Sequence, residues 1–473
     1  MPDTGPNAEL RDSSALLAHH AATLKFEAIL PEVVKLTKQC VLDVLGVIIG
    51  ATTLAPESKI VHDFVRDQGG GQDATLLGFG GKSSLAWATF FNGALGHMLD
   101  YDDLGGGGHE SVTTVPVGFA VSEKLGKVSG RDFLTAVAVG IDIQSRINTS
   151  IPTSEWVMKD GWFGTQLLGY FSGTVVAGRL MGLDHEQMQN AFGIAFTQVS
   201  GSRQMAVGVA SHIRGMQGGF TGLGSILAAD LAKRGITGSR DCLEGRYGLF
   251  TVYVKSKPDR EKLVGGLGRR FATLEDHAFK VWPACGATLS INNSILDLRQ
   301  MHGIRPEDVD EVVIVGGNDH THLLSNPIES KRRPQSSMDG KYSIPFTTAV
   351  ALVTGNVVLG NYTEQGLNDP AVLAMAQRVR HEEIPPEKKT SLVPGVRIRL
   401  KDGKSFSRST EFPRGDPRNP ASDELLKEKF RDCVSYSACP IAPDRVERAI
   451  ELVDRLESLG DVREVIRALT PGG

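Results

Sequence analysis

Two histidines and three aspartates lie within thirteen residues and could together carry out proton transfer. The segment reads His97-Met-Leu-Asp-Tyr-Asp-Asp103, and Leu104 and four glycines separate it from His109. Imidazole and carboxyl groups are the usual proton carriers in enzymes. The glycines at 105–108 let the backbone approach a ligand and present N–H groups to an anion. The segment therefore predicts an acid/base site, although its spacing also fits a surface turn with acidic caps.

A divalent metal ion is an alternative occupant, because carboxylate and imidazole groups are metal ligands. The four-glycine spacer does not match an EF-hand loop, and no second histidine cluster supports a transition-metal site. A phosphate loop is also disfavoured, because no Lys-Ser or Lys-Thr follows the glycines. We therefore expect no metal.

Composition excludes several classes of protein. The 473 residues carry a formal net charge of −4 and no basic stripe, which argues against nucleic acid as a partner. Five scattered cysteines without a CxxC pair favour a reducing, cytoplasmic setting over a zinc site or a disulfide framework. We expect no signal peptide, because the N-terminus lacks a charged segment followed by an apolar one. We also expect no membrane partner, because the early apolar run at 41–51 contains Asp43 and is too short to span a bilayer.

The elements that must position the acidic segment are helices. The first 270 or so residues read as successive helices rich in small side chains, which suits close helix packing. The clearest helical patterns cover 33–49, 130–140 (with Asp132 as a plausible cap), 184–196 and 222–233.

The pattern changes after residue 270. A strand is expected at 309–316, helices at about 289–301 and 344–353, and a hairpin around Asp402-Gly403. The basic cluster 331–333 reads as a solvated loop.

The chain turns helical and charged again from Gly415. We therefore predict a mainly α protein, in which residues 1–271 and 413–473 form one large helical domain. Residues 272–412 form a smaller inserted α+β domain.

Five stretches resemble, in the same order, motifs of the MmgE/PrpD family, which includes dehydratases, decarboxylases and an epimerase of small carboxylates. The stretches are His97-Met-Leu-Asp-Tyr-Asp-Asp103 with His109 and Ser111, Leu243-Glu-Gly-Arg-Tyr-Gly-Leu-Phe250, Lys280-Val-Trp-Pro-Ala-Cys-Gly286, Tyr342-Ser-Ile-Pro-Phe-Thr-Thr-Ala-Val-Ala-Leu352 and Gly415-Asp-Pro-Arg-Asn-Pro420. The resemblance implies an all-helical domain made from both chain ends with an α+β lid, a homodimer, and no metal or organic cofactor.

The resemblance also implies the site. Asp100, His109 and Lys280 match catalytic positions of the family. The expected substrate-binding residues are Arg214, Asp103, Cys285, Phe163, Tyr342 and Leu104.

Some of these positions depart from the family pattern. Leu104 replaces a frequent threonine, Arg214 a lysine, and Phe163 a histidine of the decarboxylase members. Cys285 also differs from a histidine of those decarboxylases, and Phe346 replaces a tyrosine. These changes make the expected pocket more apolar and remove proton carriers.

The leading hypothesis is a cofactor-independent enzyme that moves a proton on the carbon α to a carboxylate of a small di- or tricarboxylate. His109 and Asp100 would act as acid and base, while Arg214 and Lys280 hold anionic oxygens. A lyase of the dehydratase or decarboxylase type ranks first. The alternatives are an epimerase or isomerase of a dicarboxylate, and a catalytically degenerate member that only binds an acid.

Overall fold

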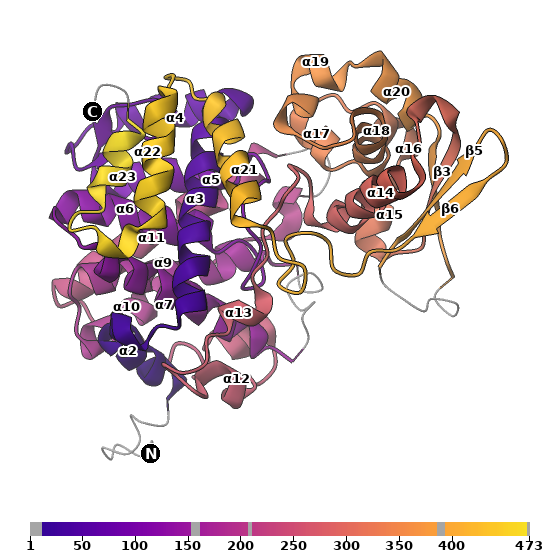
Figure 1. Cartoon of the computed structure of the whole chain (residues 1–473). Coiled ribbons are helices and arrows are strands. Elements are labelled where there is room, and N and C mark those ends of the chain that lie inside the picture. Colours follow the sequence, from indigo (N-terminus) through magenta and orange to yellow (C-terminus); the bar gives the residue numbers. More distant parts are fainter. Residues whose placement is uncertain (1–11, 153–160, 207–210, 386–392, 471–473) are drawn as a thin grey trace. The chain divides into compact units, whose positions relative to one another are not determined.

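The computed structural model describes residues 12–152, 161–206, 211–385 and 393–470 (Figure 1). The chain divides into two compact units. The helical unit combines Met1–Ala278 with Ser422–Gly473, and the α+β unit comprises Phe279–Ala421. The fold class is therefore the expected one: mainly helical, with a smaller α+β part.

The helical unit is built from helices of both chain ends. They include α2 (Ser13–Thr23), α3 (Pro31–Leu54), α4 (Glu57–Asp67), α5 (Leu85–Met98), α6 (Ser111–Leu125), α7 (Gly130–Thr149), α9 (Gly164–Leu180), α10 (His185–Phe196), α11 (Gln217–Lys233), α12 (Arg260–Val264), α13 (Thr273–Asp276), α21 (Asp423–Ser435), α22 (Pro443–Asp454) and α23 (Arg463–Ala468). A short antiparallel hairpin of β1 (Ala74–Thr75) and β2 (Lys82–Ser83) accompanies them.

Small residues let the central helices approach closely. A Cβ atom on Gly93 of α5 would overlap the backbone of Gly218 on α11. Helix α11 starts at Gln217, earlier than the Gly222 expected from sequence. The glycines that weaken its helical pattern are the residues that allow this contact.

The C-terminal helix α21 packs along α3. A Cβ on Gly50 of α3 would lie 2.9 Å from the carbonyl oxygen of Cys433 on α21. Figure 1 shows yellow α21 beside indigo α3. Residues almost four hundred positions apart thus share one buried surface, which a local sequence pattern does not report.

The α+β unit contains a four-stranded sheet of order β4-β3-β5-β6. Strand β3 (Val309–Val315) pairs parallel with β4 (Val379–Glu382) and antiparallel with β5 (Gly395–Leu400), which pairs antiparallel with β6 (Ser405–Arg408). The expected hairpin at Asp402-Gly403 is confirmed as the β5–β6 turn. The helices of this unit include α14 (Leu289–His302), α15 (Asp319–Ser325), α16 (Ile328–Arg332), α17 (Ser337–Lys341), α18 (Ile344–Thr354), α19 (Glu364–Leu367) and α20 (Pro370–Ala376).

Two local expectations were wrong. Ser129 caps α7, and its hydroxyl accepts the N–H of Asp132, which lies inside the first turn. The basic cluster 331–333 is not a solvated loop, because Lys331 and Arg332 belong to α16 and donate to backbone carbonyls. Long cationic side chains can satisfy such carbonyls while their stems pack on apolar surface.

Among the described residues, no single helix is both long and apolar enough to cross a membrane. Helices α3 and α4 together reach the required length and apolar composition, but the pair is bent by 99° between them.

Candidate active site

The acidic segment occupies the connection between α5 and α6. Asp100 adopts a left-handed backbone conformation (φ 49°), and its N–H donates to the carbonyl of His97 at 3.0 Å. This turn directly follows the C-cap of α5, Leu99. Asp100, Asp102 and Asp103 are 1%, 0% and 0% exposed, so the surface-turn alternative is wrong. Three carboxyl groups buried this deeply require partners.

Asp102 bridges two histidines. One of its oxygens lies 2.8 Å from Nδ1 of His97, and the other lies 2.7 Å from Nδ1 of His109. The two imidazole rings are 4.1 Å apart between centroids. Nδ1 of His97 therefore carries a proton that Asp102 accepts. Nδ1 of His109 also lies 2.7 Å from the carbonyl oxygen of Asp103, so its proton lies between that oxygen and Asp102, and each Nε2 keeps a lone pair.

Burial and charge fix the protonation states of this group. Burial lowers the pKa of His97 to about 4 against the opposing effect of Asp102, so His97 is neutral near pH 7. Burial also disfavours the charge of Asp102, but His109 and His97 outweigh it and hold the pKa of Asp102 well below its usual range. An anionic Asp102 then orients both rings, and the His109 side chain, 11% exposed, is the one that reaches solvent.

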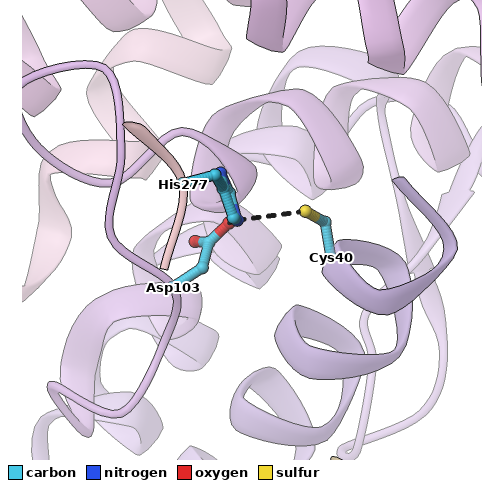
Figure 2. A group of neighbouring side chains, drawn as sticks. All are labelled: Cys40, Asp103 and His277. Carbon is cyan, nitrogen blue, oxygen red and sulfur yellow. Dashed lines mark hydrogen bonds and ion pairs between the residues drawn. The ribbon is translucent and has the colours of Figure 1, made fainter. Parts of the chain in front are cut away.

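A second buried group surrounds His277, a residue that the sequence reasoning missed. Its Nε2 lies 3.0 Å from a carboxylate oxygen of Asp103 and 3.3 Å from Sγ of Cys40 (Figure 2). Its Nδ1 lies 3.0 Å from Glu110. The hydroxyl of Ser111 donates to the same Asp103 oxygen. Asp103 is thus held by its neighbours inside the helical unit.

His277 is a buried imidazolium between the carboxyl groups of Asp103 and Glu110. Burial opposes its charge, but the Asp103 carboxylate outweighs this and holds the pKa of His277 well above its usual range. Burial raises the pKa of Glu110 to about 7, and it raises the pKa of Cys40 to about 11. Cys40 is therefore a thiol at neutral pH, not a nucleophilic thiolate.

Three of the four N–H groups of the glycine loop donate within the helical unit, contrary to the expectation that they are presented to an anion. The N–H groups of Gly105 and Gly108 donate to each other's carbonyls, at 3.0 and 2.8 Å, and that of Gly106 donates to Asp276 at 2.8 Å. The glycines are needed for another reason: a Cβ on Gly108 would lie 2.5 Å from the backbone nitrogen of Thr165. The loop is closely packed.

Arg214, Phe163 and Asp100 come together next to the histidine pair. Nη1 of Arg214 lies 3.9 Å from Asp100, whose same oxygen is 4.0 Å from Nε2 of His97. The guanidinium lies over the ring of Phe163, 5.7 Å from its centroid. The ring at the position where decarboxylase members carry histidine therefore supports a cation.

Lys429 was also missed by the sequence reasoning. It extends from α21, lies 2.6 Å from buried Asp43 of α3, and donates to the carbonyl of Tyr101 in the acidic segment. Its ammonium also lies 4.0 Å from the centroid of the Tyr101 ring. Burial raises the pKa of Asp43 to about 6, although Lys429 lowers it. The C-terminal helix thus fixes the loop that carries Asp100 and Asp102.

Leu104 contributes its backbone: it exchanges two hydrogen bonds with Ala278, at 2.8 and 2.7 Å.

The other expected residues, Lys280, Cys285 and Tyr342, lie in the α+β unit. Lys280 is 1% exposed there, so it is not a surface cation. The N–H of Cys285 donates to the carbonyl of Lys341 at 3.1 Å, and Lys331 donates to the carbonyl of Tyr342 at 2.8 Å.

A local signal existed for only one of the two missed residues. His277 precedes the Lys280 motif by three positions. By contrast, Lys429 lies in an ordinary charged helical pattern that offers no indication of burial.

Two groups in the helical unit have ligand atoms close enough to hold a metal ion. They are His97 with Asp102 and His109, and Cys40 with Asp103 and His277, with all ligand atoms in a group within 4.8 Å of one another. In both groups, however, the ligand atoms already contact one another in hydrogen bonds or ion pairs. A metal would have to replace these contacts, so the arrangement is better suited to holding protons.

Two family models match this chain. The model of the MmgE/PrpD N-terminal domain matches residues 15–262, and that of the MmgE/PrpD C-terminal domain matches residues 282–458. A cis-aconitate decarboxylase of Aspergillus terreus is 26% identical over 477 residues, which cover 96% of this chain and 95% of the relative. That of Mus musculus is 26% identical over 461 residues, covering 94% and 91%. With both models matched in order along most of its length, the chain belongs to the MmgE/PrpD family.

Proposed function

We propose that this protein is a cofactor-independent lyase that acts on the carbon α to a carboxylate of a small di- or tricarboxylate. The observation that carries the proposal is the buried His97–Asp102–His109 array, with Arg214 and Asp100 beside it. Full-length similarity to decarboxylases of a tricarboxylate supports the lyase type.

His109 is the proposed proton carrier. Its Nδ1 faces Asp102, so Nε2 is the nitrogen that would take a proton from the substrate or return one. The carboxylate of Asp102 stabilises the imidazolium that forms when Nε2 accepts a proton. His97 is neutral and fully buried, and its Nδ1 contacts the other carboxylate oxygen of Asp102. This contact fixes the orientation of the Asp102 carboxylate toward His109.

Arg214 is the proposed carboxylate clamp. Its planar guanidinium can hold a carboxylate through two parallel hydrogen bonds, and its 14% exposed side chain can reach a ligand. Asp100, 3.9 Å away, then orients the guanidinium as well as standing near the histidines. Lys280 keeps its proposed role in stabilising enolate-like charge.

The test is a panel of polycarboxylates, including cis-aconitate, incubated with the full chain in deuterium oxide and followed by proton NMR. Loss of carbon dioxide, loss of water and deuterium incorporation at the α carbon each give a distinct product spectrum. We expect at least one substrate to be turned over, and His109→Gln to abolish this above background. A panel without any exchange or product would contradict the proposal and favour a member that only binds acids.

A second candidate, an epimerase of a dicarboxylate, is favoured by the contact between Phe163 and Arg214. The Arg214 guanidinium lies over the ring of Phe163, which stands where the decarboxylase members carry a histidine. A side chain that could carry a proton is therefore absent at position 163. Epimerisation needs proton removal and return without a leaving group. In the same NMR experiment, deuterium incorporation with interconversion of diastereomers and no loss of carbon dioxide or water would identify it.

A further inference from the structure

The carboxyl ends of two parallel strands in the α+β unit meet at one edge of the sheet. Strands β3 and β4 pair in register up to Val315 and Glu382, and the N–H of Gly316 donates to the carbonyl of Glu382 at 2.8 Å. The chain leaves β3 through glycines and enters α15 at Asp319. A cavity of about 280 Å³ lies at this edge. This is the side of a parallel sheet where ligands most often bind.

Three metal-ligating side chains line this cavity. His381 belongs to β4 and Glu383 directly follows that strand, and both side chains line the cavity. His322 comes from the last turn of α15, and its Nδ1 contacts the Glu383 carboxylate. One ligand atom of each residue lies within 4.8 Å of the others. Two segments sixty residues apart thus bring two imidazoles and one carboxylate together.

The imidazole of His381 is held in the tautomer that a metal needs. Its Nε2–H donates to the carbonyl of Gly316 at 2.9 Å, which leaves a lone pair on Nδ1. That Nδ1 is buried and makes no hydrogen bond to any described residue. Metal-bound histidines characteristically donate their second nitrogen to a backbone carbonyl or carboxylate in this way. A metal would replace the contact between His322 and Glu383, but that pair is exposed and contributes little, whereas the contacts in the two groups of the helical unit are buried. The ion pair alone would not account for this feature of His381.

We propose that His322, His381 and Glu383 bind a divalent transition-metal ion of the zinc type. Two nitrogen ligands favour such an ion over Mg²⁺ or Ca²⁺, which prefer oxygen. Water completes the coordination, and Asp319, which lines the same cavity, adds negative charge near the cation. The same carboxylates disfavour an anion at this position. The bound ion links α15 to β4 and is separate from the proposed acid/base chemistry.

The first test is calorimetric titration of the metal-free full chain with zinc chloride and with cobalt chloride, near pH 7.5. We expect one site, with affinity at least about tenfold weaker in His381→Gln and in His322→Gln, because even second-shell changes cost ten- to a hundredfold. Glu383→Gln should weaken binding in the same direction. His302→Gln is the matched control, since that histidine of the same unit stacks on Phe406 outside the cavity. Absence of binding overturns the proposal.

The second test separates this site from the buried group around Cys40, which also has the composition of a metal site. The absorption spectrum of the cobalt-loaded chain should show ligand-field bands without a sulfur-to-metal charge-transfer band, because the proposed ligands contain no sulfur. A sulfur band, or binding that is unchanged in both histidine variants, assigns the metal elsewhere and overturns the proposal. The outcome does not depend on turnover, so it is independent of the lyase assignment.

Discussion

Asp102 holds two imidazoles, one on each carboxylate oxygen, and this gives the two histidines different tasks. His97 is fully buried and neutral, so it serves to orient Asp102. His109 reaches solvent and can exchange protons with a ligand. The sequence pattern paired His109 with Asp100, but in the structure the nearest carboxylate of His109 is that of Asp102.

The first prediction concerns this pair. His109→Gln should keep the fold and lower the rate of α-proton exchange by about 10²–10⁴, the usual contribution of a positioned acid or base. Asp102→Asn should also lower the rate, because an amide cannot stabilise the imidazolium. The losses in the double variant should not add, since the two groups act as one unit. Proton NMR in deuterium oxide measures all four proteins, and wild-type exchange in His109→Gln would move the chemistry to another residue.

The second prediction concerns Arg214. Replacing it by alanine should weaken the binding of the best dicarboxylate of the panel about ten- to a hundredfold, because a charge-assisted hydrogen bond contributes about 1.5–3 kcal/mol. Arg214→Lys should retain part of the affinity. Calorimetry gives the dissociation constants, and Arg234→Ala, which removes an exposed arginine directly after α11, is the control. Equal affinities in Arg214→Ala and wild type would remove Arg214 from the site.

The third prediction concerns stability and pH through His97. Its folded pKa is about 4, below the ordinary 6.5, so the unfolded chain takes up a proton at this residue first. The stability that comes from neutral His97 is complete above pH 6.5 and is lost as the pH falls towards 4, by up to about 3 kcal/mol. His97→Gln should therefore show a weaker loss of stability in this window. Denaturant unfolding at several pH values measures it, with His302→Gln as control; identical pH profiles of His97→Gln and wild type would contradict the assignment.

At the scale of elements, periodic and turn signals located most of the structure. The strand at β3, the β5–β6 hairpin and helix α18 follow from local patterns, because each carries its own apolar spacing or turn residues. The acidic segment was also recognisable as a site. Its packing was not, because the groups that enclose the glycines come from other helices.

The fourth prediction tests this packing. Gly108→Ala should destabilise the protein by about 1–3 kcal/mol, because the added methyl group meets the rigid backbone of Thr165 at the start of α9. Gly460→Ala is the control, since a Cβ there meets nothing within 4 Å. Urea unfolding gives the two free energies. If Gly108→Ala were as stable as the control, the loop would be open, and its glycines would be available for a ligand after all.

On the scale of the whole chain, the two ends meet at the buried pair of Lys429 and Asp43. No local pattern predicts this pair, because each residue lies in a regular helix and the partner is almost four hundred positions away. Lys429 also donates to the carbonyl of Tyr101, so the C-terminal segment stabilises the loop that holds Asp102. The return of the chain to the helical unit therefore completes the candidate site as well as the core.

The fifth prediction follows from this pair. Lys429→Met should destabilise the helical unit by about 3–5 kcal/mol, because it leaves the Asp43 carboxyl buried without its cation. Adding Asp43→Asn should recover part of the loss, since the remaining group is then neutral. Activity normalised to folded protein should still stay low in the double variant, because the hydrogen bond from Lys429 to the carbonyl of Tyr101 is lost. Denaturant unfolding and α-proton exchange on the same samples separate the two effects; a double variant with full activity would show that Lys429 stabilises the fold without positioning the acidic loop.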